Sequence, residues 1–197
     1  MSEEDWMPED WIPKEIGGLP LHPLVVHATV VLIPLTALVA VLFLVPRFRA
    51  ALRWPMVLLA AAALGSAYAA VLSGRNFEKT QVPAGAANTE LADVVNRHQQ
   101  LGNQLLYIVI AFTIVVWIAA YVLRPVGETG PFPRESDDDV GEEGVTRLDT
   151  IVRVVVAGLV IVGAVAVGVQ TVRVGEQGAK AVWNPTGDVD YGIGSLQ

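Results

Sequence analysis

Four long apolar stretches alternate with polar and charged segments along the 197-residue chain. They cover residues 24–45, 54–72, 101–123 and 154–172. Each approaches or exceeds the ~20 apolar residues that an α-helix needs to cross ~30 Å of hydrocarbon. The pattern therefore predicts an all-α membrane protein with a four-transmembrane-helix bundle in a lipid bilayer, and we assign residues 23–173 to this domain.

Polar segments flank the predicted spans at three places: an acidic tail over residues 1–22, an acidic loop over residues 125–145 and a second tail over residues 174–197. The first tail lacks a basic n-region, so we expect the first span to be retained as a helix and not cleaved as a signal peptide. The loop combines proline and glycine with the run "ESDDDVGEEG", a composition typical of a disordered segment.

Local patterns refine two helix bounds. An apolar stripe at helical spacing around His98 predicts a third helix from about residue 88 to residue 123. Thr146 and Asp149 have the spacing of a capping box, which predicts the start of the fourth helix. Small residues also recur every three or four positions on two spans, as is typical of close helix packing. They are Ala62, Ser66, Ala69 and Ser73 on the second span, and Ala157, Ala164, Gly168 and Thr171 on the fourth.

Basic residues near the span ends predict the orientation. The turn "RFRAALR" supplies Arg47, Arg49 and Arg53 without an acidic residue, and lysine and arginine are enriched in short cytoplasmic loops. We therefore expect this turn and the acidic loop to be cytoplasmic, and both termini to be extracytoplasmic. The excess of basic residues on the cytoplasmic side is small, with seven inside and six outside. The predicted orientation therefore rests mainly on the short turn.

Composition excludes several classes of function. The chain has no cysteine, which rules out disulfides, thiolate metal ligands and cysteine nucleophiles. Its net charge of -7 leaves no basic footprint for nucleic acid. No phosphate-binding loop and no pair of nucleophile and base is recognisable, so an electron carrier or an accessory subunit is favoured over an enzyme.

The chain has three histidines, His22, His27 and His98, and all lie where the first and third helices enter the membrane from the same side. Ionisable groups within spans are costly and are often functional, so this cluster predicts a cofactor or metal site. His22 and His27 are separated by about 140° around a helix and do not both point at one ion. Gly102, one turn after His98, either lets a flat macrocycle approach or marks a close helix crossing.

The sequence resembles the bacterial membrane proteins that carry domain of unknown function 2231. The resemblance rests on "GLPLHPLVVHATVVLIPLT", "LGSAYAAVLSG", "NRHQQLGNQ" and "VGEQGAKAVW". It implies a multi-pass protein of the bacterial cytoplasmic membrane whose four-helix fold is related to b-type cytochromes, with His22, His27 and His98 as candidate haem ligands. Many members have phenylalanine and proline where this chain has Ala28 and Thr29, and Glu176 stands after the fourth span without a histidine, so we expect no second haem.

Haem b is therefore the expected cofactor, and we expect His27 and His98 to be its axial ligands because His22 lies nearer to water. Basic side chains on the same side can receive the propionates; they are Arg97, Arg75, Lys79, Arg173 and Lys180. Coordination by two histidines leaves no open position on the iron, which favours electron transfer or a redox accessory subunit. Its partner would be another membrane redox protein or complex.

Two other functions are compatible with the same residues. A divalent zinc or copper ion could bind His98 and His22 or His27 together with a carboxylate; the available carboxylates are Glu90, Asp93 and Glu176. Alternatively, the chain is a cofactor-free accessory or scaffold subunit that binds another membrane protein through its polar tails.

Overall fold

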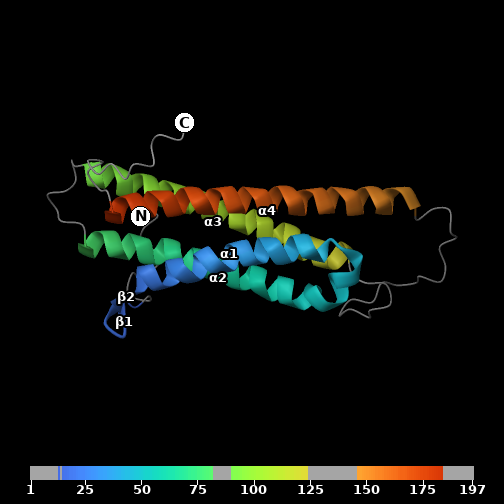
Figure 1. Ribbon diagram of the computed structural model, residues 1–197, viewed down its shortest axis with the longest axis horizontal. Coiled ribbons are helices and arrows are strands. Elements are labelled where there is room, and N and C mark those ends of the chain that lie inside the picture. Colours follow the sequence, from blue (N-terminus) through green and yellow to red (C-terminus); the bar gives the residue numbers. More distant parts are fainter. Residues whose placement is uncertain (1–12, 14, 82–89, 124–145, 184–197) are drawn as a thin grey trace, which may run out of the picture.

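The structure is a computed structural model that describes residue 13 and residues 15–81, 90–123 and 146–183. Within these ranges the chain forms four long helices side by side (Figure 1). They are α1 (Leu21–Phe43), α2 (Arg49–Gln81), α3 (Glu90–Val122) and α4 (Thr146–Trp183). Each contains a stretch long and apolar enough to cross a membrane, which confirms the predicted fold class, an all-α bundle of four membrane helices.

The helices form a ring in which α1 and α3 run in one direction and α2 and α4 in the other (Figure 1). Among the described residues, α1 packs along α2 and α4, and α3 packs along the same two helices. The diagonal pairs, α1 with α3 and α2 with α4, have few contacts. Residues on α1 and α3 can therefore face each other across the axis of the bundle.

A short hairpin precedes α1 at the end of the bundle where α1 and α3 begin (Figure 1). Strands β1 (Glu15–Ile16) and β2 (Leu19–Pro20) pair antiparallel across Gly17 and Gly18. Both glycines have positive φ, at 60° and 76°, which a two-residue hairpin turn requires and which glycine adopts without strain. The hairpin leads directly into the first turn of α1, where His22 lies.

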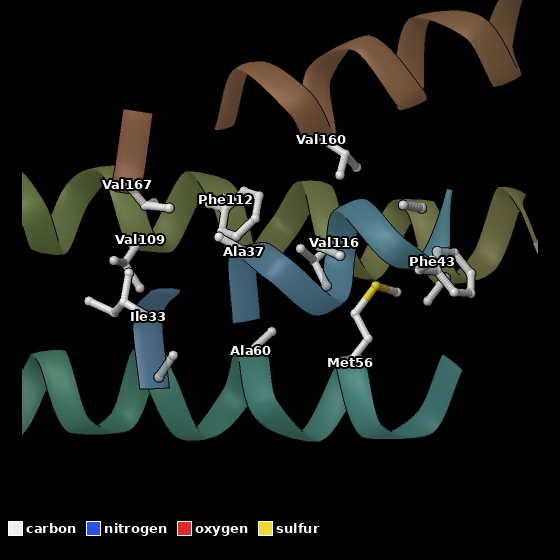
Figure 2. Packing of buried hydrophobic residues seen from close by; sticks show 14 of the residues in the cluster. Ile33, Ala37, Phe43, Met56, Ala60, Val109, Phe112, Val116, Val160 and Val167 are labelled. Atoms are coloured by element: carbon white, nitrogen blue, oxygen red, sulfur yellow. The ribbon is translucent and has the colours of Figure 1, made fainter. Parts of the chain in front are cut away.

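The core of the bundle is apolar and draws residues from all four helices (Figure 2). The labelled residues are Ile33, Ala37, Phe43, Met56, Ala60, Val109, Phe112, Val116, Val160 and Val167. The outward faces are also largely apolar, with large aliphatic or aromatic side chains exposed on every helix. Such a surface suits hydrocarbon and not water, because lipid tails are as apolar as the core itself.

Buried hydroxyl groups are satisfied within their own helices. Thr29, Thr36 and Thr171 each donate a hydrogen bond to the carbonyl oxygen four residues earlier, at 2.9, 2.7 and 2.7 Å. This bonding lets a polar side chain lie among apolar neighbours without an unpaired donor.

The helices extend further than the apolar spans predict. The fourth helix begins at Thr146, as the capping-box spacing predicts, but it continues to Trp183. Residues 174–183, which we assigned to the C-terminal tail, are therefore helical. The reason is packing, since His98 of α3 contacts Val174 and Gly178 on this extension. The expected acidic loop over residues 125–145, most of the acidic tail and residues 184–197 lie outside the described residues.

Candidate functional site

One end of the bundle brings together His22 in the first turn of α1, Ser73 on α2, His98 on α3 and Val174 on α4. We call it the histidine end, and it is the end at which the hairpin lies in Figure 1. These residues are far apart in the sequence, and they meet because α2 and α4 run back past the starts of α1 and α3. Each helix of the bundle contributes to the site.

His22 is half-buried against α2. Its Nδ1 lies 3.1 Å from Oγ of Ser73, and the hydroxyl of Ser73 donates to the carbonyl oxygen of Ala70 at 3.1 Å. Because the single hydroxyl hydrogen is used there, Nδ1–H of His22 is the donor to Ser73. The neutral ring then carries its lone pair on Nε2.

His98 is held in a similar way against α4. Its Nδ1 lies 3.1 Å from the carbonyl oxygen of Val174. A carbonyl oxygen only accepts, so Nδ1–H donates and the neutral ring carries its lone pair on Nε2. A histidine that binds a metal through one nitrogen usually donates its other N–H to such a partner, which fixes the tautomer and the orientation of the ring.

A glycine on the neighbouring helix lies against each of these rings. A β-carbon on Gly74 of α2 would lie 3.1 Å from Cε1 of His22, and one on Gly178 of α4 would lie 3.1 Å from Cε1 of His98. Both distances are shorter than ordinary van der Waals contact. Each imidazole therefore occupies space that a side chain on the neighbouring helix would take.

The two rings lie opposite each other across the bundle, one edge-on to the other. Their centroids are 6.5 Å apart and their planes are inclined by 85°. His22 and His98 come from α1 and α3, the diagonal pair that has few other contacts. The site thus presents two oriented imidazoles from opposite sides of the bundle axis.

His27 lies in different surroundings from His22, in keeping with the 140° that separates them around the helix. It is exposed, and its Nδ1–H donates to the carbonyl oxygen of Pro23, one turn earlier in α1, at 2.6 Å. The structure therefore pairs His98 with His22, which differs from the expected pairing with His27. The reason is that α2 continues past Leu72 and covers His22 with Ser73 and Gly74.

Gly102 and Arg97 lie close to His98 in sequence on α3. A β-carbon on Gly102 would meet no atom within 4 Å. Gly102 therefore does not mark a close helix crossing, which was one of its two expected roles. Arg97 is exposed, as are Arg75, Arg173 and Lys180. The histidine end therefore carries basic side chains from α2, α3 and α4.

The carboxylates do not join the histidine pair. Asp93 and Glu176 are exposed, and the side chain of Glu90 lies outside the described residues. In the part of the chain that the structure describes, no group of three or more histidine or carboxylate side chains is placed to hold a metal ion. A protein zinc site has three or four protein ligands, and the described residues offer two.

A buried amide ties α4 to α3 next to His98. Gln170, which is 4% exposed, donates from Nε2 to the carbonyl oxygen of Leu101 at 3.1 Å and to Oε1 of Gln104 at 3.3 Å. Both acceptors lie within two turns of His98. This link fixes the distance between α3 and α4 next to the His98 ring, where the apolar core begins.

Sequence reasoning gave no contact role to four residues of the site, although all four lie in the stretches "LGSAYAAVLSG" and "VGEQGAKAVW". They are the partners Ser73 and Val174 and the contact glycines Gly74 and Gly178. The sequence does hold a signal for the glycines. Each stands within a helix, where glycine costs about 1 kcal/mol relative to alanine, and each is close to a basic residue at the same end as the histidines. The sequence does not reveal the role of Val174, because this residue contributes a backbone oxygen and not a side chain.

The whole site lies within one family match. The family model described as "Predicted membrane protein (DUF2231)" matches residues 18–190. The chain belongs to this family. The DUF2231 match covers all four helices and every residue of the histidine end. Comparisons with curated proteins and with solved structures gave no match.

Proposed function

We propose that this DUF2231 protein binds one b-type haem between His22 and His98 and acts in electron transfer, as a carrier or as a redox accessory subunit of a membrane complex. The observation that carries the proposal is the pair of facing imidazoles, each fixed through Nδ1. A haem with two histidine ligands supplies a one-electron centre without an open position for substrate.

The spacing of the rings supports this assignment. Two imidazoles bound to opposite sides of one metal ion, each at about 2 Å, have ring centres about 6 Å apart. The observed separation is 6.5 Å. A pair of ligands is sufficient for haem, whose porphyrin supplies the remaining donors, whereas zinc or copper would need further protein ligands.

The surroundings also suit a flat, anionic macrocycle. Open space at Gly102 lies one turn from His98, and exposed Arg97, Arg75, Arg173 and Lys180 at the same end can pair with the two propionates. Guanidinium groups bind carboxylates through two parallel hydrogen bonds. The chain's own residues would thus hold the iron from two sides and keep the propionates at the polar surface.

In this proposal the histidine end faces the extracytoplasmic side of the bacterial cytoplasmic membrane. The charged side chains that the structure describes at the opposite end are those of Arg47, Arg49, Arg53 and Arg153, whereas the described acidic side chains, Glu15, Asp93 and Glu176, lie at or beside the histidine end. Arginine in a short loop between two spans favours the cytoplasm. An electron partner would then meet the haem from the outer side.

The direct test is an absorption spectrum of the protein purified from haem-sufficient cells, together with haem extraction and metal analysis. We expect a coloured protein with about one haem b per chain and the reduced spectrum of a six-coordinate centre. A colourless protein with stoichiometric zinc or copper would instead identify a divalent metal site. A colourless, metal-free and folded protein would favour the cofactor-free accessory subunit.

The contact glycines provide a second prediction. Gly74→Ala and Gly178→Ala should each lower haem occupancy or shift the spectrum, because the added methyl group pushes an imidazole by a few tenths of an ångström. Haem content and spectra of the purified variants measure this effect. Gly65→Ala and Gly175→Ala on the same two helices are the matched controls, since a β-carbon at either position meets nothing within 4 Å. Equal haem content and identical spectra in all four variants would contradict a role for these contacts.

A further inference from the structure

At the end of the bundle opposite the histidines, the structure describes the side chains of four arginines. Arg47 lies in η2 (Pro46–Phe48), the short turn between α1 and α2, while Arg49 and Arg53 lie in the first turns of α2 and Arg153 lies near the start of α4. We call this the arginine end. Asp149 of α4 also belongs to this end, but its side chain lies outside the described residues. No acidic side chain that the structure describes lies there.

Arg49 has an unmet hydrogen-bonding group. One terminal nitrogen, Nη2, donates to the carbonyl oxygen of Leu44 at 3.1 Å. Its Nε is buried and has no hydrogen-bond partner among the described residues. A buried donor without an acceptor costs about 1–3 kcal/mol, and more when the group is charged. The site therefore lacks an acceptor beside Arg49.

A second positive charge belongs to the same end of the bundle. Arg153 lies near the start of α4, and its charge acts on the guanidinium group of Arg49. Arg153 is exposed, so it is accessible from outside the bundle. Two guanidinium groups from different helices, one with a buried unpaired N–H, favour an anion that bridges them.

The surrounding side chains place this anion at a membrane surface. Arg47 stacks on the ring of Phe48 at 4.5 Å, and Arg53 stacks on that of Trp54 at 5.7 Å. Trp54 is 56% exposed, and tryptophan at the end of a span is typical of the level of the lipid headgroups. Exposed valines lie beside the arginines, at Val45, Val152 and Val154, and provide an apolar surface for acyl chains.

We propose that Arg49 and Arg153 bind the phosphate of an anionic phospholipid headgroup. The phosphate oxygens accept from the terminal nitrogens of the two guanidinium groups and offset the repulsion between them, while the acyl chains lie on the adjacent apolar surface. Basic pockets between membrane helices bind anionic headgroups in this way. The inference is independent of the haem proposal, since it concerns the other end of the bundle.

Native mass spectrometry of the full chain in detergent tests the proposal with added phosphatidylglycerol or phosphatidylcholine. We expect the wild type to retain phosphatidylglycerol in preference to phosphatidylcholine. The double variant Arg49→Gln/Arg153→Gln should bind phosphatidylglycerol roughly 30-fold more weakly, the factor that corresponds to about 1 kcal/mol for each guanidinium group. Gln100→Ala, a change of an exposed residue of α3 at the other end of the bundle, is the control and should bind as the wild type does.

The single variant Arg153→Gln should fold as the wild type does, because this side chain is exposed. It should weaken phosphatidylglycerol binding by roughly 5-fold. Equal affinity of the wild type and the arginine variants for phosphatidylglycerol would overturn the proposal. If inorganic phosphate protects the wild type against heat as well as the lipid does, the site binds a free anion and not a headgroup. If the lipid binds only after the acidic residues of 135–143 are neutralised, the chain's own loop occupies the arginines and the lipid assignment is wrong.

Discussion

His98→Ala and His22→Ala should each remove most of the haem from the purified protein, whereas His27→Ala should leave haem content close to that of the wild type. Each of the first two substitutions deletes one of the two facing imidazoles. Loss of a supporting hydrogen bond to a ligand typically costs roughly 10- to 100-fold in metal affinity, and loss of the ligand itself should cost more. Haem per chain, measured by extraction and by the reduced spectrum, gives the result.

His27→Ala is the control in this series. The His27 side chain is exposed and forms a hydrogen bond within its own helix, so its removal should change neither the fold nor the spectrum. Partial recovery of the spectrum of His98→Gly by added imidazole would show that the variant is folded and lacks only the ligand. Retention of haem in His22→Ala together with its loss in His27→Ala would contradict the structural pairing and restore the one expected from the sequence.

The number and approximate positions of the helices were predictable because the bilayer imposes a length on each apolar run. The start of α4 was predictable as well, since Thr146 and Asp149 form a local pattern. The ends of α2 and α4 were not. Beyond the hydrocarbon these helices carry polar residues and glycines, and they persist because they pack against α1 and α3, which hydropathy does not reveal.

The pairing of the histidines shows the same limit. Sequence placed His22, His27 and His98 at one end of the bundle, and helix geometry separated His22 from His27. The choice between them depended on how far α2 extends, because Ser73 and Gly74 shield His22. The length of α2 follows from tertiary contacts and not from any property of the first helix.

The small-residue stripe on the second helix was only in part a guide to its buried face. Of the four residues that sequence spacing selected, Ser73 is buried, Ser66 and Ala69 are half-buried and Ala62 is exposed, whereas the apolar core buries Ala60, Ala63 and Ala67. The helix is so rich in alanine that several faces have the same spacing. Composition of this kind permits close packing on any face, and the neighbouring helices decide which one is used.

Gly163→Ala should destabilise the bundle by about 1–3 kcal/mol, the usual cost of overfilling a packed core. A β-carbon at Gly163 of α4 would lie 2.5 Å from Cδ2 and 3.1 Å from Cε2 of Phe112 on α3. Phe112 is 4% exposed and lies in the middle of the core (Figure 2), so its ring cannot move aside without displacing its neighbours. Thermal or denaturant unfolding in detergent, followed by circular dichroism, measures the loss.

Gly158→Ala is the matched control, one and a half turns earlier on α4, where a β-carbon meets nothing within 4 Å. It should be neutral or slightly stabilising, because alanine is favoured over glycine in a helix by up to about 1 kcal/mol. Phe112→Leu should relieve the effect of Gly163→Ala, since it removes the ring atoms that the new methyl group meets. The double variant should then be more stable than the sum of the two single changes predicts. A Gly163→Ala protein as stable as the Gly158→Ala protein would show that α3 and α4 do not approach each other at Phe112 as closely as the structure has them.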